Sequence, residues 1–193
     1  MRKSLYVLLS AIFLFLLAGA QDQQEPKRGP STPEERKRFL AIVRKLEKSP
    51  LDQSLNSEVT WALKWLQDIP DVNVTICFAP LGPLPNDEYR YDSKIRGQFV
   101  LGMGAYLVEH PQKAADSSAT YLAGVESALK VYRAILKSKP EAKSRALDDL
   151  LAKQENGELN DFVRDASKAC EDTNKASISG HRAVGSSGHL VTG

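Results

Sequence analysis

The sequence predicts a mainly α-helical protein, a single-domain bundle of about six helices with one short extended or β segment near residues 72–78. Apolar residues recur every three or four positions through most of residues 34–170, which is the spacing of one face of a helix. Prolines and glycines interrupt this pattern at intervals that fit helix ends. Only around residues 72–78 does the period change to two. A segment of this length can bury one sizeable core, so we expect one domain.

The first twenty residues have the composition of a secretory signal peptide. Arg2 and Lys3 precede an apolar run over residues 5–17, and small residues follow up to Ala20. A short basic start, an apolar centre and a small-residue exit are typical of a leader that is removed on export. We therefore expect residues 1–20 to be a signal peptide and the protein to be secreted, into the periplasm or the extracellular medium. The apolar run is too short for a stable membrane anchor, so we expect none after cleavage.

Two polar segments flank the expected helical domain over residues 34–170. Residues 21–33 contain three prolines and no large apolar side chain, and residues 171–193 are rich in Ser and Gly. Segments of this composition cannot bury enough apolar surface to order themselves. We therefore expect a disordered tether before the domain and a disordered tail after it.

The helices are expected in the following order. The first begins after Thr32, which is placed to cap it, with Pro33 at the first helical position. Its apolar face contains Phe39 and Leu46, and Ser49-Pro50 ends it. Asp92 or Ser93 is expected to cap the third helix. This helix is apolar on nearly every side, so we expect it to be the central, most buried helix. The expected helices after the first cover residues 52–68, 92–109, 117–137, 140–154 and 158–170.

The segment 72–78 is the one strand that the sequence predicts. Val72, Val74, Ile76 and Phe78 alternate with smaller or polar residues, which is the period of a strand. A lone strand cannot satisfy its own backbone hydrogen bonds. It therefore crosses the bundle as an extended segment, pairs with a short second strand, or pairs with a protein partner or with a second copy in a homodimer.

The two cysteines leave two alternatives open. Cys77 and Cys170 both fall in the part expected to be exported, where an oxidising compartment would join them in a disulfide. Such a bond would link the last helix to the middle of the chain. The other alternative is a pair of buried thiols, because a free cysteine packs as a small apolar residue.

Charge and ligand chemistry argue against several classes of function. Of the 26 Lys and Arg residues, two lie in the expected leader, and the remaining 24 balance 24 Asp and Glu. A neutral chain gives no reason to expect a nucleic acid as partner. Two of the three histidines lie in the expected tail, so we expect no metal site and no cofactor.

Without an obvious catalytic set, the sequence favours a protein that is not an enzyme, and we expect a non-catalytic module for protein binding. The candidate binding residues are Trp61, Trp65, Leu81 and Leu84, which lie beside a helical core stripe and in a proline-rich loop. The alternative for the tryptophans is that they belong to the core.

Two other functions remain open from the sequence. A hydrolase would use two carboxylates, such as Asp87 or Glu88 with Glu126. A carrier would hold a small apolar ligand between helices near Gly97 and the two glycines that follow it in the central helix.

Overall fold

The structure is a computed structural model that describes residues 28–84 and 89–170. Within these ranges the protein is mainly α-helical and fits a helical bundle. The expected signal peptide, the first part of the expected tether and the expected tail lie outside the described residues. No helix in the described ranges is long and apolar enough to cross a membrane.

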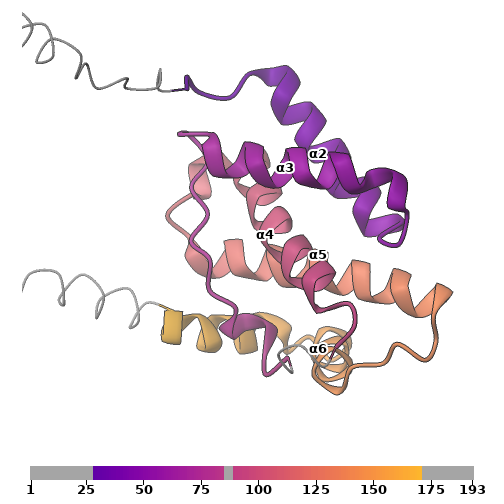
Figure 1. The fold of residues 1–193 in the computed structure, drawn as a ribbon. Coiled ribbons are helices and arrows are strands. Elements are labelled where there is room, and N and C mark those ends of the chain that lie inside the picture. The colour runs from indigo at the N-terminus through magenta and orange to yellow at the C-terminus, as the bar shows by residue number, and fades with distance from the viewer. Residues whose placement is uncertain (1–27, 85–88, 171–193) are drawn as a thin grey trace, which may run out of the picture.

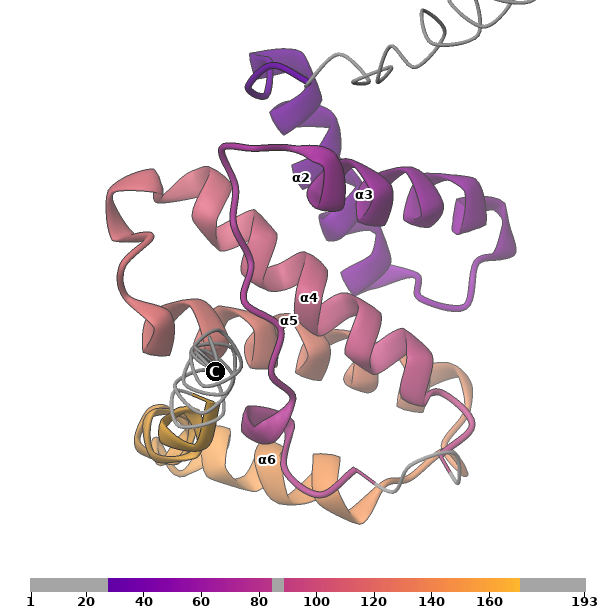
Figure 2. The same cartoon turned by 60° about the vertical axis from the view of Figure 1, so that its left-hand side comes forward.

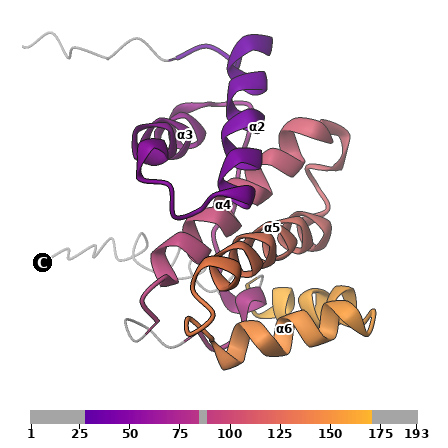
Figure 3. The ribbon, with the colours of Figure 1, turned by 90° about the vertical axis from the view of Figure 1, so that its right-hand side faces the viewer.

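The helices form three layers, which are seen most clearly in Figures 1 and 3. The first layer holds α2 and α3, the second holds α4 and α5, and the third holds α6 and a helical segment over residues 159–170. Three short 3-10 turns lie in the connections. The bounds are α2 Pro33–Lys48, η2 Gln53–Leu55, α3 Asn56–Asp68, η3 Ala79–Leu81, α4 Asp92–Glu109, η4 Pro111–Lys113, α5 Ser117–Ser138 and α6 Arg145–Glu155.

The start of α2 confirms the predicted cap. The Thr32 hydroxyl accepts a hydrogen bond from the Glu35 backbone N–H, and the Glu35 carboxylate accepts one from the Thr32 N–H. This reciprocal pair satisfies two of the donors that every helix leaves unbonded at its first turn. Pro33 follows at the first helical position, where the missing N–H of proline costs nothing.

The central position predicted for residues 92–109 is also confirmed, because α4 contributes to both hydrophobic cores. Phe99 and Met103 pack into a core with α5, α6 and residues 159–170. Leu101 and Ala105 pack into a second core with α2 and α3. A helix with an apolar residue on every side is stable only when it is covered on every side, and α4 meets this condition between the two outer layers. Its first turn is not capped by a side chain, contrary to the prediction for Asp92 or Ser93.

The helix α6 begins five residues later than predicted. Residues 140–144 form a turn instead, and the buried Tyr132 hydroxyl accepts a hydrogen bond from the Ser144 backbone N–H at 2.8 Å. The same hydroxyl donates to the Asp148 carboxylate at 2.7 Å. Burial and the neighbouring Asp148 raise the pKa of Tyr132, so the hydroxyl keeps the proton that it donates. A tertiary contact, which periodicity cannot reveal, thus sets the start of α6.

The predicted strand at 72–78 is wrong: no strand occurs in the described residues, and this segment is an irregular connection. It runs from the end of α3 to η3, from the first layer to the third (Figures 1 and 2). The side chain of Val72 is buried, whereas that of Ile76 is 57% exposed. Every neighbour of the segment is helical, so it has no strand to pair with. The period of two does not persist in the burial of its side chains, because Ile76 is open to solvent and Cys77 faces the third layer.

A disulfide joins Cys77 in this connection to Cys170 at the end of the last helical segment. The two residues are 93 positions apart in the sequence. The bond therefore closes a loop that contains α4, α5 and α6, and it fixes the irregular connection against the third layer. Cross-linking distant positions stabilises a fold mainly by reducing the conformational entropy of the unfolded chain.

We predict that reduction of this disulfide lowers the free energy of unfolding by about 4 kcal/mol, the value expected for a closed loop of this size. The melting temperature should fall by about 10 °C. Thermal unfolding of the full chain with and without dithiothreitol measures both effects, and Cys77→Ser with Cys170→Ser should reproduce them. An equal melting temperature in both conditions, with two thiols that react after denaturation, would contradict the bond.

Residues before α2 are attached to the end of α3 by Asp71. Its carboxylate accepts hydrogen bonds from the Ser31 backbone N–H at 2.9 Å, from the Ser31 hydroxyl at 2.7 Å and from Arg36 Nη2 at 2.7 Å. Partial burial opposes ionisation, but the hydrogen bonds from Ser31 and Arg36 outweigh it and lower the pKa of Asp71 to about 2.

Because the folded pKa of Asp71 lies below its unfolded value, its contribution to stability is present above about pH 4 and is lost as the pH falls toward 2. We predict that Asp71→Asn lowers the free energy of unfolding near pH 7 by about 1 kcal/mol, after allowance for solvent screening. The variant should lose less stability than the wild type between pH 4 and pH 2. Urea unfolding over this range measures the difference. Asp161→Asn, at an exposed ion pair, is the control and should change little.

Candidate functional site

The structure places three of the four predicted binding residues in the interior. Trp65 is 2% exposed and stacks on Phe39, with ring centroids 4.6 Å apart. Leu81 and Leu84 are buried in the other core, beside α5 and α6. These residues are core positions, and they do not form one surface. Only Trp61 remains partly open, and the Arg38 guanidinium lies 3.9 Å from the centre of its ring.

The two carboxylates that a hydrolase would use cannot be placed together within the described residues. Asp87 and Glu88 lie outside them, and Glu126 is exposed on α5. The described ranges also hold no group of three or more His, Cys, Asp or Glu side chains placed to bind a metal ion.

A groove of about 260 Å³ lies between α3 and α4, near the first half of each helix. The wall from α3 consists of Asn56, Val59 and Leu63. Leu63 is 38% exposed, and with Ile76 it is one of two large apolar side chains in the described residues that are open to solvent. Leu46 of α2 and Val131 of α5 also line the groove. Its lining is therefore mainly aliphatic.

The wall from α4 consists of Ser93, Lys94, Gly97, Gln98 and Leu101, and the last four lie on one helical face. Residues spaced by three, four and seven positions lie one above another on a helix. Larger hollows occur elsewhere, one of about 630 Å³ beside Lys143 and Arg145 and one of about 510 Å³ along the basic face of α5, but both are more open to solvent. The groove combines an apolar lining with a small number of polar groups, as ligand sites commonly do.

Gly97 differs from the other glycines of α4 in its surroundings. A Cβ atom at Gly102 would lie 2.5 Å from the Ser127 Cβ, and one at Gly104 would lie 2.8 Å from the Leu66 Cδ1. These two glycines permit neighbouring helices to approach closely. A Cβ at Gly97 would meet nothing within 4 Å. Glycine inside a helix lowers stability relative to alanine, and no close contact in the described chain requires a glycine at position 97. The missing side chain at Gly97 widens the groove.

Gln98 is 3% exposed, and its amide is held in one orientation. Its Nε2 donates to the Ser127 hydroxyl at 2.8 Å and, at 3.4 Å, to the Val43 carbonyl. The Ser127 hydroxyl donates its own proton to Glu47, so it can only accept from Gln98. The Oε1 atom of Gln98 accepts no hydrogen bond from any described residue. An acceptor is therefore left over in the wall of the groove.

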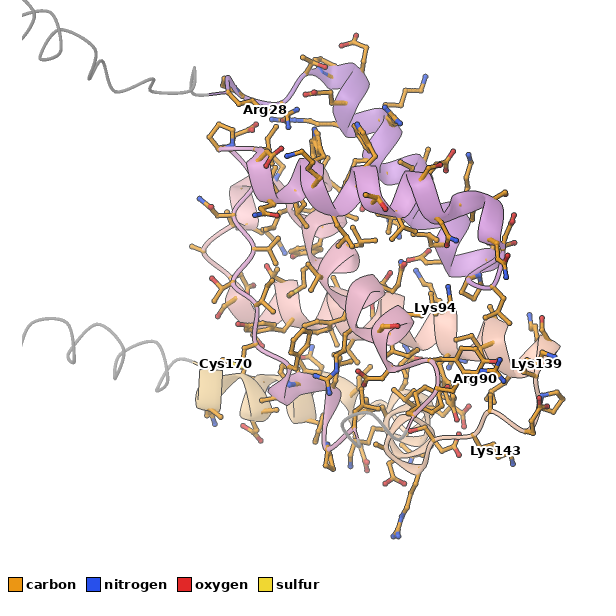
Figure 4. All side chains as sticks on the ribbon, in the orientation of Figure 1. Arg28, Arg90, Lys94, Lys139, Lys143 and Cys170 are labelled. Carbon is orange, nitrogen blue, oxygen red and sulfur yellow. A yellow bond between two sulfur atoms is a disulfide. The ribbon has the colours of Figure 1, made fainter. Side chains whose placement is uncertain are left out.

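Lys94 supplies the one charge in the lining. Its side chain is exposed and makes no ion pair within the described part of the chain. Lys94 lies toward the same end of the molecule as Arg90, Lys139 and Lys143 (Figure 4). Arg90 and Lys143 line one further hollow together with Glu141.

Comparison with known proteins gives no relative to which this site could be assigned. No family model matches the sequence, and neither a curated protein nor a solved structure matches it.

Sequence reasoning identified Gly97 but missed Lys94 and Gln98. The available signal was a glutamine in a helix that is apolar on nearly every side, next to a glycine. A buried glutamine needs hydrogen-bond partners, so its position marks a polar contact inside the bundle. The width of the groove depends on the spacing of α3 and α4 and had no signal in the sequence.

We predict opposite effects of alanine at two glycines of α4. Gly97→Ala should raise the free energy of unfolding by up to about 1 kcal/mol, because it removes the helix penalty of glycine and meets no neighbour. Gly102→Ala should lower it by about 1–3 kcal/mol, because the new methyl group would overlap Ser127. Urea denaturation compares them directly. Equal destabilisation by both variants would show that the groove is closed in solution.

Proposed function

We propose that this protein is a non-catalytic binding protein that holds the apolar part of a small ligand in the groove between α3 and α4. The observation that carries the proposal is the opening at Gly97, where the two helices leave an aliphatic surface exposed. In accordance with the predicted leader, we propose that the protein works after export.

The size of the groove favours a small ligand. An apolar cavity of about 150 Å³ is large enough for benzene, and pockets for drug-sized molecules begin at about 300 Å³. The groove, at about 260 Å³, falls between these values. One aromatic ring system or a short aliphatic chain would fill it.

The lining supports binding as its task. Lys94 is the one ionisable group among the described residues of the groove, and the rest of the lining is aliphatic, amide, hydroxyl or backbone. Such a surface binds an apolar body through exclusion of water, with polar groups that orient it.

We predict that Leu63→Gln weakens the binding of neutral indole about tenfold, because the variant replaces a large part of one apolar wall. Titration of the ¹⁵N-labelled full chain with indole, followed by amide chemical shifts, measures the dissociation constant. Ile76→Gln is the matched control: Ile76 is the other exposed large apolar residue, and it lies outside the groove.

The control variant should bind indole as the wild type does. If indole leaves the amide shifts of α3 and α4 unchanged, or if both variants lose binding equally, the groove is not the binding site.

A further inference from the structure

We propose that the ligand of the groove is a small amphipathic carboxylate, an aromatic acid whose ring carries an N–H or O–H donor. This inference rests on the proposed binding function and specifies its ligand. Three features of the α4 wall carry it: an acceptor inside the groove, a cation at its edge, and the distance between them.

The acceptor is the Oε1 atom of Gln98. The side chain is almost fully buried, and its amide nitrogen is already engaged by Ser127 and Val43. The oxygen itself is not one of the fully buried polar atoms that lack a partner, so it is open to solvent from the groove. A ligand that displaces this solvent must replace the hydrogen bond, because an acceptor left unpaired in a dry contact costs free energy. The oxygen can be satisfied from the groove only by a group that donates. A purely hydrocarbon ligand would leave it unpaired, so the apolar body must carry an N–H or O–H.

The cation is Lys94, the third residue of α4. The first turn of a helix has a partial positive charge, so a lysine there is disfavoured unless an anion lies near it. The nearby carboxylate of Asp92 is already paired with Arg96 at 2.7 Å. Lys94 makes no ion pair with any described residue. An anionic group at this edge of the groove would be favoured by both the ammonium group and the helix dipole.

The spacing of Lys94 and Gln98 limits the ligand further. They are four positions apart on α4, so their Cβ atoms are about 6 Å apart on the same face. Gly97 lies between them and leaves room for a flat ring. A molecule with its donor on one side of an aromatic ring system and a carboxylate on the other side spans this distance. Indole-3-acetate has this arrangement and fits the size of the groove.

Three probes separate the two polar contacts. Indole-3-acetate has both the ring N–H and the carboxylate, 1-naphthaleneacetate lacks the N–H, and indole-3-ethanol lacks the charge. We expect indole-3-acetate to bind the full chain about fivefold more tightly than either of the others at low ionic strength, because each loses one contact. Isothermal titration calorimetry or amide shift titration gives the three dissociation constants.

Variants of two lysines test the role of the charge. Lys94→Gln should remove the advantage of indole-3-acetate over indole-3-ethanol and leave the binding of the alcohol unchanged. Lys113→Gln is the matched control, since Lys113 is an exposed lysine beyond the other end of α4. It should change neither dissociation constant.

The outcomes distinguish this inference from the proposed function. If all three probes bind equally well and Lys94→Gln has no effect, the ligand class is wrong while the groove remains a binding site. If 1-naphthaleneacetate binds as tightly as indole-3-acetate, the donor contact to Gln98 is absent and the inference fails in that part. If none of the probes binds, the inference and the proposed function fail together.

Discussion

The architecture depends on how closely α4 and α5 approach each other. At Gly124 of α5 a Cβ atom would lie 2.7 Å from the Met103 Cγ and 2.8 Å from the Phe99 carbonyl oxygen, and at Gly102 it would overlap Ser127. Both helices therefore have glycine where their backbones meet. This contact fixes α4 in the middle of the bundle. The outer helices must then adapt to α4, and α3 does so over only part of its length.

The groove follows from this partial fit. Leu66, near the end of α3, packs against Gly104 so closely that a Cβ there would lie 2.8 Å from it. Leu63 and Val59, about one and two turns earlier, line the groove with Gly97. The two helices are thus close at one end and separate toward the other. The opening is a consequence of helix geometry, so a ligand would find it preformed.

A hydrogen-bonded network holds the polar wall of the groove in place. Glu47, with a side chain that is 8% exposed, accepts from Ser127 at 2.8 Å, from Arg44 at 3.0 Å and from Lys130 at 3.3 Å. Ser127 in turn accepts from Gln98, so the network joins α2, α4 and α5. Buried polar networks specify one arrangement when their members are satisfied. Here the network directs the amide nitrogen of Gln98 inward and leaves its oxygen for the groove.

Much of the fold could be predicted from the sequence, because the apolar period of the helices and the Thr32 cap are local properties. The strand at 72–78 could not be judged, since a period of two in the sequence does not show whether a second strand lies beside the segment. The start of α6 depended on Tyr132, which lies in another helix. The burial of Trp65 and Leu81, which the sequence suggests as binding residues, could not be predicted for a similar reason. The sequence pattern around them does not distinguish a buried side chain from an exposed one. The groove could not be predicted from the sequence, because it depends on the distance between α3 and α4 in the folded bundle.

The most direct test of a ligand site between α3 and α4 is a set of intermolecular nuclear Overhauser effects between bound indole-3-acetate and the methyl groups of the full chain. We predict contacts from the ring protons to Val59, Leu63, Leu101 and Val131, whose side chains line the groove. Contacts confined to Trp61 or Ile76, which lie outside the groove, would contradict it.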